Sequence, residues 1–188
     1  MKDLEFAKSQ DINGDWSWGN QFAGIKMNSN YFVFDIMSRL IDENPQIRLI
    51  NEFGTHTGTF ATYLGLEGVR KKITVITWEI QKQVSEETNN LLEFLSVNQE
   101  ICDVFAERER IIEIVAAQPT YLICDGGDKQ AEALIFGAVL PSGSIMSIHD
   151  WGQEVTYQHL EPIWDKIIPI RPEEWGLHNC QFASFRIK

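Results

Sequence analysis

Short apolar runs alternate with amphipathic segments along most of the chain, and this alternation limits the possible folds more than any other feature of the sequence. The run 47–53 is too short for a buried helix and stops at Gly54, as a buried strand does. The segment 31–41, in contrast, places its apolar residues on one face of a helix. Further strands are predicted at 73–80, 101–105, 121–124 and 144–148, and further helices at 58–67, 84–97, 107–117, 129–140 and 154–167.

This succession of strand–helix units predicts an α/β protein with a Rossmann-like, doubly wound sheet that is mostly parallel and has helices on both faces. The sequence contains no internal repeat and no linker rich in Gly, Ser or Pro. Residues 1–188 are therefore expected to form a single domain, with 1–28 as an irregular N-terminal segment. In an open parallel sheet, ligands bind at the carboxyl ends of the strands. The residues that directly follow each predicted strand are thus the candidates for chemistry.

Charge and cysteine content exclude several classes of protein. With 16 Lys and Arg against 27 Asp and Glu, the net charge is −11, and the chain lacks the basic stripe that binds nucleic acid. No apolar run approaches the ~20 residues of a membrane-spanning helix, and residues 1–5 lack the apolar core of a signal peptide. The three cysteines are widely spaced and form no C-x-x-C pair. A cytoplasmic protein with neither nucleic acid nor membrane as a partner is therefore expected.

The loop after the first predicted strand has the composition of a ligand-binding turn. It runs Asn-Glu-Phe-Gly-Thr-His-Thr-Gly-Thr over 51–59. Gly54 permits a tight turn and the close approach of a ligand, and Gly58 lets the next helix pack close to the sheet. That helix presents unpaired N–H groups to a polar or anionic ligand. His56 occupies the middle glycine position, so the run is not the dinucleotide fingerprint G-x-G-x-x-G, and an ordinary strand–helix turn is the alternative interpretation.

Acidic residues follow the second and third predicted strands. Glu79 lies about twenty residues beyond the glycine turn, the spacing at which a carboxylate accepts hydrogen bonds from both ribose hydroxyls. Asp103 and its apolar neighbour Val104 suit the edge and face of an adenine ring. Together with the glycine turn, these residues predict a cofactor that contains adenosine.

The fourth and fifth predicted strands also end in acidic residues. Asp125 and Asp150, with His149 directly before the latter, would face one crevice from adjacent strands. Three interpretations stay open at this point. These side chains bind a hard divalent ion, act as bases without a metal, or cap the following helices, as Asp128 is expected to do for the helix from Lys129.

Taken together, the motifs resemble those of one family. The run Leu-Ile-Asn-Glu-Phe-Gly-Thr-His-Thr-Gly at 49–58 resembles the first motif of the class I S-adenosylmethionine-dependent methyltransferases, in the E-x-G-T-x-T-G form of the catechol-type O-methyltransferases. Residues 122–151, with Asp-Gly-Gly, Leu-Pro-Ser-Gly-Ser and His-Asp, resemble the fourth and fifth strands of the small cephalosporin hydroxylase-like group. The resemblance covers residues 30–155, and the order and spacing of the motifs agree throughout.

The resemblance implies roles for individual residues. The residues that it assigns to S-adenosylmethionine are Glu52, Gly54, Thr55, His56, Gly58, Glu79, Asp103, Val104 and Asp125. The catalytic candidates are Lys129, His149 and Asp150, and Asp125, His149 and Asp150 match the positions that bind magnesium in metal-dependent relatives. His149 departs from the family pattern, which usually has two acids or Asp-Asn after the fifth strand. Lys129 lies one position later than the catalytic lysine of the catechol-type enzymes.

The resemblance also predicts the C-terminal part of the fold. The family's sheet ends in an antiparallel hairpin, which fits strands at 167–170 and 182–187. The segment 171–179 between them, with Trp175 and His178, would lie near the methyl acceptor.

The N-terminal segment is expected to cover the cofactor. It contains the aromatics Trp16, Trp18 and Phe22, followed by Gly-Ile-Lys-Met at 24–27. In the alternative interpretation these aromatics pack into a core.

The family resemblance also implies a homodimer in which a second copy completes the open acceptor side.

The implied reaction is methyl transfer from a sulfonium to a nucleophile, with O-methylation of a small hydroxylated molecule favoured. Asp150 or His149 would act as general base. With a metal, Asp125 and Asp150 would instead bind an ion that lowers the pKa of the acceptor hydroxyl. Two other functions stay open: a nicotinamide-dependent oxidoreductase, against which the missing glycine counts, and a catalytically silent nucleoside-binding or assembly protein that keeps the fold.

Overall fold

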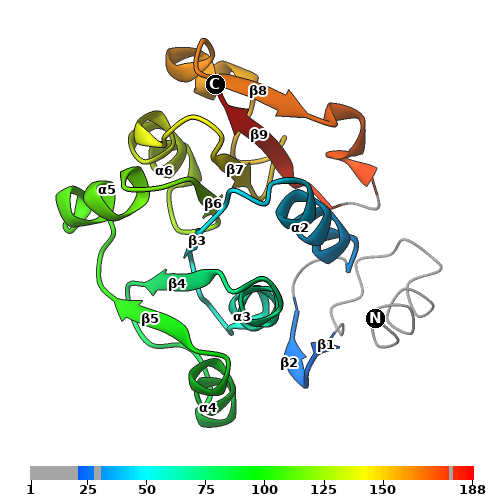
Figure 1. Cartoon of the computed structure of the whole chain (residues 1–188), viewed down its shortest axis with the longest axis vertical. Helices are drawn as coiled ribbons and strands as arrows, with labels where there is room; N and C mark the ends of the chain where they lie inside the picture. The colour runs from blue at the N-terminus through cyan, green and yellow to red at the C-terminus, as the bar shows by residue number, and fades with distance from the viewer. Residues whose placement is uncertain (1–20, 28–30, 178–179) are drawn as a thin grey trace.

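The fold is known from a computed structural model, which describes residues 21–27, 31–177 and 180–188. Within these residues, one sheet has seven strands in the order β5-β4-β3-β6-β7-β9-β8 (Figure 1). The strands from β3 to β7 pair in parallel, whereas β9 runs antiparallel between β7 and β8. The strands are β3 (Leu49–Phe53), β4 (Thr74–Glu79), β5 (Val97–Ile101), β6 (Thr120–Cys124), β7 (Ile145–Ile148), β8 (Ile167–Ile170) and β9 (Ala183–Ile187).

The order of the strands reverses between β3 and β6. From β3 the chain winds outward through β4 to β5, and then it crosses back to β6 and continues to β7 on the other side. Such a reversal leaves a crevice at the carboxyl ends of the two central strands, because the loops that follow them turn in opposite directions. Phe53 and Cys124 are the last residues of these strands and are partners in the register of the sheet.

Helices cover both faces of the sheet (Figure 1). One face packs against α2 (Phe32–Glu43), α3 (Thr59–Lys71) and α4 (Glu86–Phe94), and the other against α5 (Arg108–Ala116) and α6 (Lys129–Ile135). Alternate residues of a strand point to opposite faces, so Ile50 and Ile123 belong to the first core, and Phe53 and Leu122 to the second. These central strands are buried on both faces, as their apolar runs predict. The predicted doubly wound sheet with a C-terminal antiparallel hairpin is confirmed.

The third strand was placed wrongly by the sequence pattern. A strand was predicted at 101–105 after a helix at 84–97, but the helix ends at Phe94 and the strand is β5, Val97–Ile101. Ser96, at φ 58°, reverses the chain between them. Because β5 is an edge strand with Asn, Gln and Glu at its centre, it lacks the apolar run that marks the inner strands.

The helices predicted at 129–140 and 154–167 are also shorter than expected. The first is α6 followed by a 3₁₀ turn, η1 (Gly137–Val139), and the second is a 3₁₀ helix, η2 (Tyr157–Ile163). Pro162 lies inside η2 and has no N–H to donate to a helical hydrogen bond. No helix in the described part of the chain is both long and apolar enough to cross a membrane.

A short hairpin, β1 (Gln21–Phe22) and β2 (Ile25–Lys26), precedes α2. The ring of Phe22 packs against Phe34 and Tyr63, with centroids 4.9 and 5.7 Å away, so this aromatic belongs to the core. Trp16, Trp18 and His178, to which roles near the cofactor or acceptor were assigned, lie outside the described residues.

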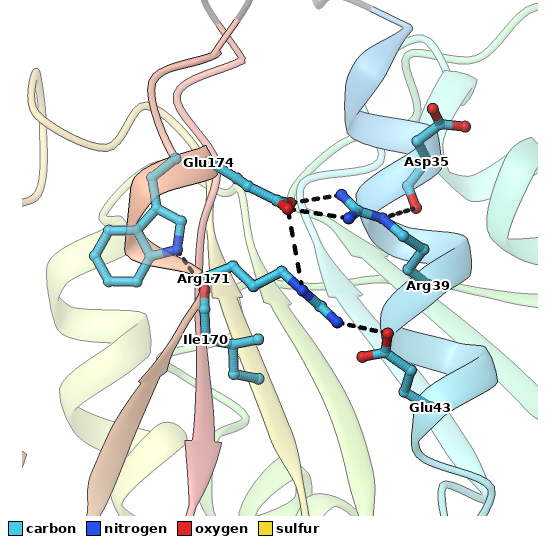
Figure 2. A network of polar contacts seen from close by, with 7 residues as sticks. Asp35, Arg39, Glu43, Ile170, Arg171 and Glu174 are labelled. Carbon is cyan, nitrogen blue, oxygen red and sulfur yellow. Dashed lines mark hydrogen bonds and ion pairs between the residues drawn. The ribbon is translucent and has the colours of Figure 1, made fainter.

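A network of ion pairs joins α2 to the turn η3 (Pro172–Glu174) that follows β8 (Figure 2). Arg39 donates hydrogen bonds from both terminal nitrogens to the carboxylate of Glu174, at 3.1 and 2.6 Å. A terminal nitrogen of Arg171 lies 2.5 Å from the carboxylate of Glu43, which belongs to α2 as Arg39 does. Trp175, buried beside this network, donates from Nε1 to the carbonyl of Ile170 at 2.8 Å. The network fixes the C-terminal hairpin against the helix that precedes the first central strand.

We expect Glu174→Gln to lower the free energy of unfolding by up to about 1 kcal/mol, since the pair is partly exposed. The hydrogen bond from Arg39 holds the pKa of Glu174 below its ordinary value. A carboxyl with a depressed folded-state pKa adds stability above its unfolded pKa and loses that contribution as pH falls through its folded pKa. Urea unfolding of the variant and wild type should therefore differ at neutral pH and converge in acid.

Glu173→Gln removes the same charge from an exposed neighbouring position and is the matched control. It should leave the unfolding midpoint within error of wild type. Equal losses in the two variants would show that overall charge, rather than the bridge to Arg39, is responsible.

Candidate active site

A cavity of about 480 Å³ opens beyond the carboxyl ends of β3, β4, β6 and β7. This is the place that the strand order predicts for a ligand, and the volume lies within the roughly 300–1,000 Å³ that is usual for small-molecule sites. The cavity is lined by residues of four strand ends, the start of α3 and the N-terminal hairpin: Met27, Glu52, Gly54, Thr55, His56, Thr57, Thr59, Phe60, Glu79, Gln83, Asp125, Gly126, Gly127, His149 and Asp150.

The glycine loop and Glu79 converge on this cavity. The Glu79 carboxylate accepts hydrogen bonds from the backbone N–H of His56 and of Ile80, both at 2.9 Å. Gly54 has φ 91°, and a Cβ at this position would lie 2.1 Å from the carbonyl oxygen of Asp125. Only glycine therefore lets the ends of β3 and β6 come this close. The structure thus brings together the first two ligand-binding elements predicted from the sequence.

Three other residues assigned to the cofactor lie outside the cavity lining. Gly58, at φ 89°, begins α3, and a Cβ there would lie 2.7 Å from a methyl group of Thr88, so this glycine lets α3 approach α4 rather than the sheet. Asp103 accepts hydrogen bonds from the N–H groups of the turn that leads to α5. Val104 packs partly against the second core. Their contact with a cofactor stays a prediction.

The N-terminal hairpin reaches the glycine loop. The hydroxyls of Thr57 and Thr59 donate to the carbonyl of Lys26, at 3.1 and 2.8 Å. The next residue, Met27, lines the cavity. This part of the expected cover segment therefore closes one wall of the site.

Glu52 is a fully buried acid at the wall of the cavity. Its Oε2 accepts a hydrogen bond of 2.6 Å from the Thr77 hydroxyl, whereas Oε1 has no partner among the described residues. Burial raises the pKa of Glu52 to about 8, assisted by the charges of Asp125 and Glu79 and opposed by the Thr77 hydroxyl. At neutral pH this carboxyl is mostly protonated, and a cationic ligand group beside it would favour its ionised form.

A cluster of five charged side chains lies at the ends of β6 and β7. His149 Nδ1 is 3.1 Å from Asp125 Oδ1 and 3.4 Å from Asp150 Oδ1. On the far side of Asp150, Lys129 Nζ lies 3.1 Å from Oδ2 and also 2.8 Å from Glu154. Asp150 has φ 55°, an uncommon backbone conformation for a residue with a side chain, and such positions concentrate at functional sites.

The charges in this cluster stabilise one another. Burial alone would lower the pKa of His149, but the attraction of Asp125 and the hydrogen bonds to Asp125 and Asp150 outweigh it and raise this pKa to about 10. For Lys129, burial is likewise outweighed by Glu154, Asp125 and Asp150, which raise its pKa. The hydrogen bond from His149 and the contact with Lys129 hold the pKa of Asp150 well below its ordinary value. At neutral pH the cluster therefore contains the His149 imidazolium, the Lys129 ammonium and the ionised carboxylate of Asp150.

The three residues of the predicted metal site offer a mixed set of ligand atoms. Asp125, His149 and Asp150 each offer a ligand atom, and these atoms lie within 4.8 Å of one another. One of the three is an imidazole nitrogen, however, whereas Mg²⁺ prefers oxygen ligands. The ammonium of Lys129, 3.1 Å from Asp150 and 3.9 Å from Asp125, already places a positive charge beside the two carboxylates.

Sequence reasoning missed several residues of the site. Gln83 lines the cavity from the loop after β4, and the aromatic ring of Phe60 contacts His149 from α3 at a centroid distance of 5.6 Å. Glu154 contacts Lys129 because the chain turns back after Asp150. In the sequence, the only sign of this contact is that Glu154 follows Asp150 by four residues.

No protein-family model and no curated protein matches the chain. Solved structures share its fold. A structure of CmcI with Mg and SAM superposes with a TM-score of 0.68 at 13% identity, over 90% of this chain and 76% of that one. CmcI with SAH gives 0.60 at 12% identity, over 89% and 81%. A methyltransferase from Geobacter sulfurreducens gives 0.55 at 10% identity, over 100% and 87%. The chain therefore has the fold of class I S-adenosylmethionine-dependent methyltransferases.

We expect Gly54→Ala to destabilise the protein by about 2–4 kcal/mol, since the new methyl group clashes with the Asp125 carbonyl and φ becomes strained. Gly143→Ala is the matched control, because Gly143 also has a positive φ, 84°, but the nearest atom to its Cβ is 3.7 Å away. It should cost about 1–2 kcal/mol from strain alone. Urea unfolding measures both, and equal losses would contradict the close contact at Gly54.

We expect Glu52→Gln to remove a pH dependence of stability. A carboxyl whose pKa rises from 4.5 in the unfolded chain to about 8 in the folded protein binds a proton on folding. It therefore makes the free energy of unfolding fall as pH rises from about 4.5 to about 8. The variant should gain stability relative to wild type between pH 5 and pH 8 in urea unfolding. A constant difference between the two proteins across this range would contradict the raised pKa.

Proposed function

We propose that the protein is a methyltransferase that transfers the methyl group of S-adenosylmethionine to a hydroxyl oxygen of a small molecule. The observation that carries this proposal is that the Gly54 loop, Glu52 and Glu79 line one cavity together with Asp125, His149 and Asp150. The first group suits an adenosine-containing cofactor, and the second suits an acceptor that must lose a proton. The solved structures of the same fold with SAM and SAH support this cofactor.

The lining residues suggest an orientation for the cofactor. Glu79 would accept hydrogen bonds from the ribose hydroxyls. Glu52, whose Oε1 has no partner among the described residues, would bind the ammonium group of the amino-acid part. Asp103 and Val104 would contact an adenine ring only if that ring extends past the lining toward the turn between β5 and α5.

In the proposed reaction, the acceptor oxygen attacks the methyl carbon in line with the sulfonium sulfur. The new O–C bond forms while the S–C bond breaks, its electron pair stays on sulfur, and the product is S-adenosylhomocysteine. The hydroxyl proton passes to a carboxylate that lines the cavity, and Asp125 is the candidate that the contacts favour. His149 and Lys129 hold the pKa of Asp150 well below its ordinary value, so Asp150 is the weaker proton acceptor. His149, protonated at neutral pH, would stabilise the negative charge that develops on the oxygen rather than act as the base.

The two competing functions make different demands on the site. A nicotinamide-dependent oxidoreductase needs a glycine at the position of His56, whose φ is 45°, to bring the backbone close to a pyrophosphate. A catalytically silent nucleoside-binding or assembly protein would have no need of the charged cluster at Asp150. The small-molecule acceptor and a homodimer are further parts of the proposal, and both follow from the resemblance to the methyltransferase family.

Isothermal titration with S-adenosylhomocysteine and with NADH tests the proposed cofactor. We expect micromolar or tighter binding of the former and no detectable binding of the latter. Glu79→Gln should weaken the binding of S-adenosylhomocysteine at least tenfold, because the ribose hydroxyls lose a charged acceptor.

Glu100→Gln removes an equal charge from the neighbouring strand, outside the cavity, and should bind like wild type. Binding of NADH in preference to S-adenosylhomocysteine, or no binding of either, would refute the methyltransferase assignment. An equal effect of the two substitutions would refute the role of Glu79 alone.

A further inference from the structure

The positive charge beside the two aspartates is supplied by the chain itself. Lys129 is almost fully buried, with 7% of its side chain exposed, and its Nζ lies within 4 Å of three carboxylates. The contacts are 2.8 Å to Glu154, 3.1 Å to Asp150 and 3.9 Å to Asp125. Without this ammonium, the partly buried carboxylates of Asp125 and Asp150 would face one another with less positive charge between them.

Two local structures hold the ammonium in this place. Asp128 caps α6 by accepting a hydrogen bond of 2.9 Å from Ala131 N–H, and this fixes Lys129 as the first residue of the helix. Behind Asp150 the chain makes a tight turn, in which Glu154 N–H donates to the Asp150 carbonyl at 3.0 Å. The turn carries the Glu154 carboxylate back over Lys129. The salt bridge therefore joins α6 to the loop that bears Asp150.

His149 contacts both aspartates through Nδ1, one of the two ring nitrogens with which a histidine can bind a metal. Its Nδ1 lies 3.1 Å from Asp125 Oδ1 and 3.4 Å from Asp150 Oδ1. A carboxylate oxygen only accepts hydrogen bonds, so Nδ1 must carry the hydrogen in these contacts. A nitrogen that binds a metal must instead present its lone pair. A divalent ion at this position would thus have to displace the hydrogen of Nδ1 and would also lie close to the Lys129 ammonium.

We propose that this site works without a divalent cation, and that Lys129 is a positioning residue that supplies the fixed positive charge in its place. Lys129 contacts Asp150 Oδ2, which leaves Oδ1 toward His149. The role of this site in methyl transfer rests on the proposed function. Cation binding at the site can be measured whether or not that function is correct. It predicts that removing the ammonium creates a metal site.

The experiment is a Mn²⁺ titration of the full chain followed by electron paramagnetic resonance, with and without saturating S-adenosylhomocysteine. Wild type should show no Mn²⁺ site that depends on Asp125. Lys129→Met should bind one Mn²⁺ at least tenfold more tightly than wild type, and Asp125→Asn in that background should abolish the gain. Lys166→Met is the matched control, because it removes an equal charge from an exposed lysine whose ammonium donates to the Ala138 carbonyl and forms no ion pair within the described residues.

Each result decides for or against the inference. A Mn²⁺ site in wild type that is lost in Asp125→Asn would overturn it, as would equal affinities in Lys129→Met and Lys166→Met. If wild type binds Mn²⁺ and Asp125→Asn binds it equally well, the ion lies elsewhere on the acidic surface. This result agrees with the inference. If Lys129→Met does not fold, Lys129→Gln, which also removes the ammonium charge, replaces it, with the same tenfold gain expected and no gain counting against the inference.

The two proposals fail in different ways. If S-adenosylhomocysteine does not bind, the proposed function fails while the Mn²⁺ comparison without that ligand still decides the inference. If S-adenosylhomocysteine binds only after Mn²⁺ is added, and EDTA releases it, the proposed function stands and the inference is wrong.

Discussion

The close approach of Gly54 to the backbone of Asp125 is the constraint on which the site depends. A Cβ at position 54 would lie 2.1 Å from the Asp125 carbonyl oxygen, so the two central strand ends meet only because this residue has no side chain. The same junction is closed by a hydrogen bond from Asp125 N–H to the Phe53 carbonyl at 3.1 Å. It brings the glycine loop and the charged cluster to the lining of one cavity. The parallel register of β3 and β6 and the reversal of strand order between them make this contact possible.

Charge is distributed unevenly around this cavity. Glu52 is mostly neutral at neutral pH because burial raises its pKa to about 8. Asp150 is instead kept ionised by His149 and Lys129. Glu52 can therefore respond to an incoming cation by losing a proton, while the cluster at Asp150 already holds charges of both signs. This separation suits a cationic sulfonium donor next to an acceptor that loses a proton.

The sequence predicted the central strands and the site at their ends better than it predicted the edges. Strands β3, β6 and β7 are buried on both faces, so they need continuous apolar runs that are visible without a structure. The edge strand β5 is partly exposed and polar, and its position was predicted four residues too late at each end, at 101–105 instead of Val97–Ile101. Glu79 was identified from its distance to the glycine turn. Glu154 had no comparable signal, since its contact with Lys129 depends on a turn whose geometry is set by tertiary structure.

A crystal structure of the protein with S-adenosylhomocysteine tests the central claim most directly. The account predicts that the ligand occupies the cavity between Gly54 and Asp150, with its ribose hydroxyls within hydrogen-bond distance of Glu79. A ligand bound elsewhere on the molecule, or a cavity closed by the side chains of Met27 and Phe60 with Glu79 turned away, would contradict it.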